Sequence, residues 1–176
     1  MAVAFTTQLE RFEDSPLWGY HLVVPNEIAE DLIEGDDRRM VCTLENKISF
    51  HCALMPSKTS GWFIMINKSN RNKLGLVRGQ VMAVQLEKDT SDYGMPMPDE
   101  LHELLLQDEV GSDYFHALTP GKQRNLIHFV GQVKSSDIRL RRAFVVVEHL
   151  KMHQGVINFK ALSQEMKAAN QLYNRK

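Results

Sequence analysis

The sequence predicts a small domain made mostly of β-strands, followed by a region of α-helices. About six short stretches in the first 90 residues are rich in β-branched and aromatic residues and are separated by turn signals, which is typical of a small barrel or sandwich rather than a parallel α/β sheet. Residues 90–98, TSDYGMPMP, form the clearest linker. Beyond them, apolar residues recur every three or four positions, the period of amphipathic helices.

The β-rich part begins with strands predicted at residues 3–12 and 18–25, followed by a short helix at 26–35. A hairpin is expected next, because RRMVCTL and ISFHCALM flank the short connection ENK. Alternation places Cys42 and Cys52 on core-facing sides of these two strands. We therefore expect two buried, structural thiols that are near neighbours, and no disulfide framework.

Two further strands and a helical turn complete this part. Residues 60–69 are strongly apolar and predict a strand, and residues 70–76 predict a helical turn that Gly75 ends. Residues 77–89 alternate two apolar sets, so the last strand is expected to be partly buried on both faces.

The second part of the chain is predicted to be helical throughout. Pro98 and Pro120 occupy positions where proline starts a helix, and Asp99 and Glu100 suit the positive end of a helix dipole. The expected helices lie at residues 98–108, 113–118, 119–133, 136–152 and 158–173.

The helix at 136–152 carries an apolar stripe that we expect to dock it onto its own protein. The stripe consists of Leu140, Ala143, Phe144, Val147 and Leu150. Three arginines lie in the N-terminal half of this helix, where the dipole disfavours cations by ~0.3–1 kcal/mol each. They therefore need a partner, and Lys134, Arg139 and Arg142 are our candidates for binding an anion or an anionic partner.

Charge is unevenly distributed along the sequence. Residues 119–176 contain 11 Lys and Arg against 3 Asp and Glu, a balance of +8, while the net charge of the chain is −1. This asymmetry has two interpretations, and the sequence leaves both open. The basic part pairs with acidic side chains of the same chain, or it presents a surface to an anionic partner.

The sequence contains no pattern that assigns catalysis, a metal or a cofactor. His149 and His153 are four residues apart on one helix face, but neither an H-E-x-x-H arrangement nor a further ligand accompanies them. Neither a G-x-S-x-G elbow nor a phosphate-binding glycine loop is present. We expect no catalytic residue, no metal ligand and no cofactor, and a protein that is not an enzyme.

The cellular compartment is predicted to be the cytoplasm. No stretch approaches the ~18 apolar residues of a membrane span, and the N-terminus lacks the pattern of a signal peptide. Two cysteines fit a reducing compartment. The oligomeric state is not predicted.

The first part resembles a bacterial and archaeal family of unknown function that pairs a pseudo-barrel with a short helical extension. The resemblance rests on WGYHLVVPNEIAEDL, VCTLENKISFHCALMP, WFIMINKSNRNKLGLVRGQVMAVQLEKD and MPDELHELLLQD. The stretch FVGQVKSSDIRLRRAFVVVEHL resembles the YdeI / OmpD-associated family of bacteriocin-protection proteins. Lys134, Arg139, Arg141 and Arg142 fit that family's pattern, whereas Val133 replaces its usual alanine and Ile138 its usual threonine.

The resemblance implies a small double-split (pseudo) β-barrel with a C-terminal helical extension packed on it. We expect a barrel domain at residues 1–92, a YdeI/OmpD-associated-like helical region at 93–155, and an amphipathic C-terminal helix at 156–176. The implied role is protective or partner-binding. The arginine cluster and the basic C-terminal part, rather than the resemblance, predict an anionic ligand or protein as the partner. A nucleic-acid binder and a small-molecule enzyme with a cleft between barrel and helices stay open as alternatives. Nucleic acid is the less expected partner, because the barrel sequence is acidic.

Overall fold

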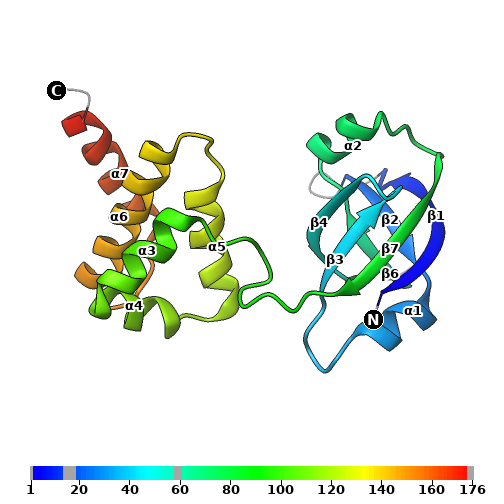
Figure 1. The fold of residues 1–176 in the computed structure, drawn as a ribbon, viewed down its shortest axis with the longest axis horizontal. Coiled ribbons are helices and arrows are strands. Elements are labelled where there is room, and N and C mark those ends of the chain that lie inside the picture. The colour runs from blue at the N-terminus through cyan, green and yellow to red at the C-terminus, as the bar shows by residue number, and fades with distance from the viewer. Residues whose placement is uncertain (1, 14–18, 58–60, 174–176) are drawn as a thin grey trace. The chain divides into compact units, whose positions relative to one another are not determined.

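A computed structural model describes residues 2–13, 19–57 and 61–173, and the chain divides into two compact units, residues 1–90 and 91–176 (Figure 1). Trp18, Ser60 and residues 174–176 belong to predicted elements but lie outside the described residues. The three domain boundaries expected from the sequence stay predictions.

The first unit is a seven-stranded antiparallel sheet that curls into a half-barrel (Figure 1). Its strand order is β4-β3-β7-β1-β2-β6-β5, and β4 also contacts β6, which shows how far the sheet curls. The elements are β1 (Val3–Arg11), β2 (Tyr20–Val24), α1 (Asn26–Leu32), β3 (Arg39–Leu44), β4 (Ile48–Ala53), β5 (Met55–Ser57), β6 (Gly61–Met65), α2 (Lys68–Leu74) and β7 (Val81–Lys88). The predicted fold class, a small β-barrel followed by helices, is confirmed.

Alternation along the strands builds the core of the barrel unit. On β7, Met82, Val84 and Leu86 are buried, whereas Val81 and the other residues of the opposite face are exposed. The expectation that this strand is partly buried on both faces was therefore wrong. Small and polar side chains fill its outer face, and one face of an antiparallel sheet can remain solvated.

The two cysteines lie together in this core. Cys42 and Cys52 are free and buried, and a hydrogen bond between the thiols together with burial raises the pKa of Cys42 above its ordinary value. The prediction of two buried, neighbouring thiols is confirmed.

Charge is segregated within the barrel unit. Helix α1 carries Glu27, Glu30 and Asp31, and α2 carries Lys68, Arg71 and Lys73. The two helices lie at opposite ends of the barrel (Figure 1). The helices at the two ends of the barrel thus carry charges of opposite sign.

In the part of the second unit that the structure describes, five helices form a bundle in which α6 is central. These helices are α3 (Asp99–Gln107), α4 (Glu109–His116), α5 (Pro120–Gly131), α6 (Ser136–Met152) and α7 (Phe159–Tyr173). Helix α6 contacts each of the other four helices, so its three valines are buried on more than one side. No helix within the described residues is long and apolar enough to cross a membrane.

The predicted apolar stripe of α6 is covered over only part of its length. Ala143, Val147 and Leu150 are buried, but Leu140 is 49% and Phe144 is 56% exposed. The expectation that the whole stripe docks onto its own protein was wrong for these two residues. They face an open groove that α3, α6 and α7 form.

Candidate functional site

Arg139, one of the predicted site residues, forms a closed ion pair with Glu100 of α3. Its Nη2 lies 2.8 Å from Oε1 of Glu100, and its Nε donates to Oε2 at 2.9 Å. The Ser136 hydroxyl donates to the same carboxylate at 2.6 Å. These hydrogen bonds, first the one from Arg139 and then the one from Ser136, lower the pKa of Glu100 to about 2.

The remaining nitrogen of Arg139 is also occupied. Its Nη1 donates to the carbonyl of Val133 at 3.2 Å and to that of Lys134 at 2.8 Å. The guanidinium therefore joins α3 to the segment before α6, and its ionic and hydrogen-bonding capacity is used within the helical unit.

Arg142 and Lys134 have different surroundings. Arg142 donates from Nη1 to the carbonyl of Phe129 at 2.6 Å, and its guanidinium lies 4.9 Å from the ring centroid of Phe129. Lys134 is exposed, and its ammonium makes no ion pair within the described residues. Binding of an anion at Lys134, Arg139 and Arg142 stays a prediction.

The ion pairs of the helical unit connect its acidic and basic halves. Residues 91–118 contain seven Asp and Glu and no Lys or Arg. Besides the Glu100–Arg139 pair, Asp108 lies 2.7 Å from the Nζ of Lys151. Lys151 also lies 2.8 Å from Glu148 of its own helix, so the acids that meet these two cations come from α3, from the residue before α4 and from α6.

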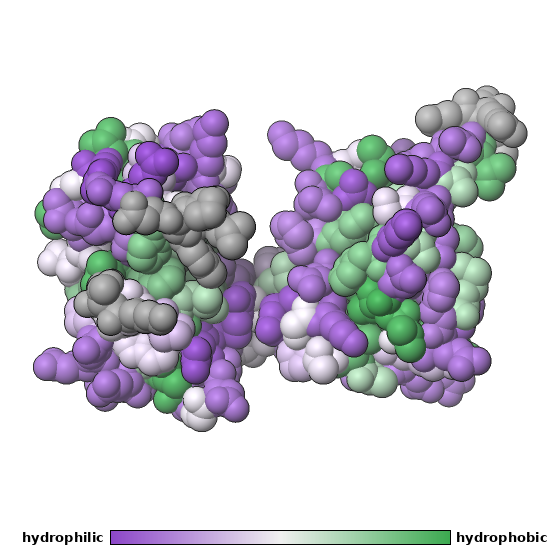
Figure 2. Space-filling view, turned by 180° about the vertical axis from the view of Figure 1, so that it is seen from behind, coloured by the Kyte–Doolittle hydropathy of each residue, from purple (hydrophilic) through white to green (hydrophobic). Residues whose placement is uncertain are grey.

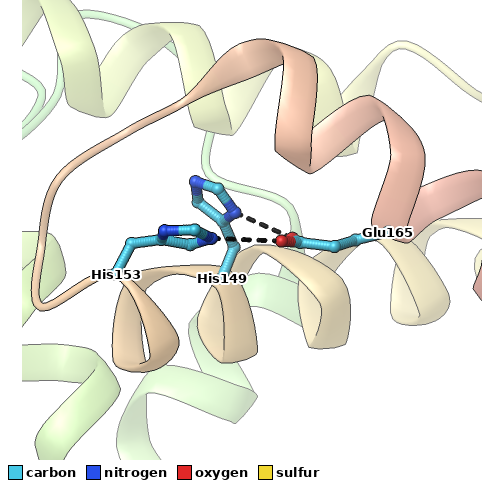
Figure 3. Close-up of side chains that lie close together, drawn as sticks. All are labelled: His149, His153 and Glu165. Atoms are coloured by element: carbon cyan, nitrogen blue, oxygen red, sulfur yellow. Dashed lines mark hydrogen bonds and ion pairs between the residues drawn. The ribbon is translucent and has the colours of Figure 1, made fainter.

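Three side chains that could hold a metal ion meet between α6 and α7 (Figure 3). His149 Nδ1 lies 2.7 Å from Glu165 Oε2, and His153 Nε2 lies 3.2 Å from Glu165 Oε1. The ligand atoms lie within 4.8 Å of one another. His149 is fully buried, whereas Glu165 and His153 are partly exposed.

The hydrogen bonds of His149 define the tautomer of this cluster. The backbone N–H of Asn158 donates to His149 Nε2 at 3.1 Å, so Nε2 carries the lone pair and Nδ1 carries the proton. Nδ1 therefore donates to Glu165. A metal ion bound at Nδ1 would have to displace this proton and the Asn158 hydrogen bond, so in this arrangement the trio fastens α7 to α6.

The groove beside Leu140 and Phe144 is lined mainly by apolar side chains. It measures about 400 Å³, and its walls come from Leu104 of α3, from α6, and from Ala169, Leu172 and Tyr173 of α7. Leu172 is 68% and Tyr173 is 61% exposed. Figure 2 shows, on one face, how hydrophobic residues form patches between hydrophilic ones in each unit.

One wall of this groove is held in place by Arg141. Its Nη1 donates to Asn170 Oδ1 at 2.8 Å, and its guanidinium lies 3.9 Å from the ring centroid of Tyr173. A cation–π contact of this kind contributes ~0.5–1 kcal/mol at an exposed site. These two contacts join the end of α7 to α6 along this wall of the groove.

Family comparisons match both units. Residues 5–86 match a family described as Domain of unknown function (DUF1905). Residues 95–153 match one described as Bacteriocin-protection, YdeI or OmpD-Associated. The two matches do not overlap, and they follow one another in this order along the chain. No curated protein matches the chain. The YdeI/OmpD-associated match ends at His153, so α7, with Glu165 and Tyr173, lies beyond it.

Sequence reasoning found part of these sites and missed the rest. It paired His149 with His153 by their spacing, but Glu165 and Asn158 come from beyond the end of that helix. It identified the apolar stripes of α6 and α7. The spacing of apolar residues, however, does not indicate which end of a stripe stays uncovered. The exposed ends of the two stripes meet only in the folded unit.

Proposed function

We propose that this protein is a binding protein whose helical unit docks an apolar or amphipathic segment of a protein partner in the groove between α3, α6 and α7. The observation that carries the proposal is the group of large apolar side chains exposed around one concave surface. This group consists of Leu140, Phe144, Leu172 and Tyr173.

The physical argument is that exposed apolar area gathered in a groove is favourable to cover. Burying it stabilises a complex by roughly 25 cal/mol per Å² before the costs of association. Single exposed apolar residues are common on proteins, but a grouped set of this kind marks an interaction surface. An amphipathic helix in a groove is the recognition mode that this geometry suits.

The wider role in the proposal is protection under stress, in the cytoplasm. The family that residues 95–153 match is described by bacteriocin protection. A protein can protect by binding alone, so the role requires no catalytic machinery.

An anionic ligand at Lys134, Arg139 and Arg142 is the second candidate. It is favoured by Lys134, which is exposed beside the two arginines and makes no ion pair within the described residues. Salt-sensitive thermal stabilisation by phosphates or polyanions would support it. Equal melting temperatures with and without these anions at low salt would remove it.

The groove is tested with a helical peptide that has leucines on one face and glutamines on the other, so that it carries no side-chain charge. Fluorescence anisotropy with the full chain should show binding that Phe144→Ala weakens at least tenfold. The matched control is Leu106→Ala, because Leu106 is 68% exposed on α3 and does not line the groove. Equal binding by the two variants, or no binding by the unmodified chain, would overturn the proposal.

A further inference from the structure

We infer that the segment bound in this groove is a basic amphipathic helix, with apolar side chains against the groove and Lys or Arg along its edge. This inference rests on the proposed function and specifies its partner. The observation behind it is a second hollow that adjoins the groove between α3, α6 and α7.

The two grooves share a wall. A hollow lined by α3 and the start of α6 includes Leu104 and Leu140, and both residues also line the apolar groove. The surface therefore continues from the apolar side chains of α6 and α7 to the outer face of α3 without a break in its lining.

The second hollow, which α3 and the start of α6 line, is acidic. Asp99 and Glu103 line it one helical turn apart on α3, and Asp137 of α6 lines the apolar groove close to the junction. All three are exposed, and no ion pair within the described residues involves them. They offer three carboxylates to a ligand in the groove.

The other charges of this surface do not cancel these carboxylates. Glu100 and Arg139 neutralise each other in their ion pair. Arg141 is the remaining cation in the lining, and it is directed to Asn170 and the ring of Tyr173. The lining of the two hollows thus contains three unpaired acids and one cation. These three acids, Asp99, Glu103 and Asp137, form an acidic rim that attracts positive charge.

Charge complementarity therefore selects the occupant. A helix with leucine-like residues at spacings of three and four places them against Leu140 and Phe144, and its basic flank then faces the acidic rim. An acidic amphipathic helix would bring like charges together at the same place. The groove thus suits a partner of the opposite sign to the anion predicted at the neighbouring arginines.

The experiment compares three labelled helical peptides with identical leucines and with Lys, Gln or Glu on the polar face. With the full chain at low salt, the Lys peptide should bind at least tenfold more tightly than the Gln peptide, and the Glu peptide more weakly than both. Raising the salt concentration should remove most of the difference between the Lys and Gln peptides.

The rim is tested by the triple variant Asp99→Asn, Glu103→Gln, Asp137→Asn. It should reduce binding of the Lys peptide to the level of the Gln peptide and leave the Gln peptide unchanged. This second measurement also verifies that the variant is folded.

A matched control neutralises three exposed acids of the same unit that line neither groove, with Asp92→Asn, Glu109→Gln and Asp113→Asn. It should retain at least half of the affinity for the Lys peptide. Equal losses in the control and the rim variant would overturn the inference, because net charge alone would then account for the binding.

The outcomes separate the two proposals. Binding of the Gln peptide without preference for Lys overturns only the basic partner, whereas failure of the Gln peptide to bind overturns the proposed function as well. Tightest binding of the Glu peptide, or a dimer in sedimentation that Phe144→Ala dissociates, assigns the groove to an acidic partner or a second copy and overturns this inference.

Discussion

The ion pair between Glu100 and Arg139 gives the sharpest stability prediction, through Glu100→Gln. The side chain of Glu100 is 12% exposed, and it accepts from Nε and Nη2 of Arg139 and from Ser136. The substitution keeps the shape but removes the charge. A hydrogen bond to a charged group contributes about 1.5–3 kcal/mol, and the amide oxygen retains part of this. We expect a loss of ~2 kcal/mol in the free energy of unfolding at pH 7.

The effect should depend on pH in a defined direction. The pKa of Glu100 is lowered from an ordinary 4.5 to about 2 in the folded protein. The folded state therefore binds fewer protons than the unfolded state between these values. The contribution is complete above the unfolded pKa and is lost as the pH falls through the folded pKa. The difference between the two proteins should shrink below pH 4.5 and approach zero near pH 2.

Urea unfolding followed by circular dichroism at 222 nm measures this difference, since the second unit is helical. The matched control is Glu103→Gln, one helical turn along α3, because Glu103 is exposed and makes no ion pair within the described residues. Its effect should stay below ~0.5 kcal/mol. Equal losses in the two variants, or a loss for Glu100→Gln that is the same at pH 2 and pH 7, would refute this account of the ion pair.

Three further substitutions or reactions test the packing. Gly111→Ala places a Cβ 2.5 Å from a methyl group of α6 and should cost about 2 kcal/mol in thermal or urea unfolding, whereas Gly121→Ala, with no atom within 4 Å, should cost nothing. His149→Ala removes a fully buried ring and the acceptor of a backbone N–H; we expect a loss of about 2–4 kcal/mol, and a loss below 1 kcal/mol would contradict the assigned hydrogen bonds. Cys42 and Cys52 should react with a thiol reagent at least a hundredfold more slowly in native protein than in urea, because both side chains are buried and the thiolate of Cys42 is disfavoured by burial and by its hydrogen bond with Cys52; rapid labelling of the native protein would exclude this packing.

Much of the fold could be predicted from the sequence, because local patterns decided it. Alternation placed the strands, and the short connection ENK became the turn at Glu45 and Asn46, whose φ angles are 49° and 51°. Proline and the change to helical spacing marked the second unit. These signals act within a few residues, so they do not depend on the tertiary fold.

The binding surfaces could not be predicted in this way, because they depend on contacts between distant residues. Glu100 and Arg139 are 39 residues apart, and no spacing rule pairs them. The stripe through Leu140 and Phe144 indicated an apolar face, but the covering of that face depends on how far α7 extends along α6. Hydrophobic periodicity identifies the side of a helix that avoids water and leaves open whether the neighbour is the same chain or another molecule.

The separation of charge between α1 and α2 gives the barrel unit a permanent electric dipole moment. The net charge of the chain is only −1 and its pI is about 6.7, so repulsion between molecules near neutral pH is weak. At ~0.01 M salt the screening length is about 30 Å, and at ~0.15 M it is about 8 Å. The oppositely charged helices α1 and α2 of different molecules therefore attract one another in dilute buffer. We expect an osmotic second virial coefficient that is negative at low ionic strength and rises as salt is added.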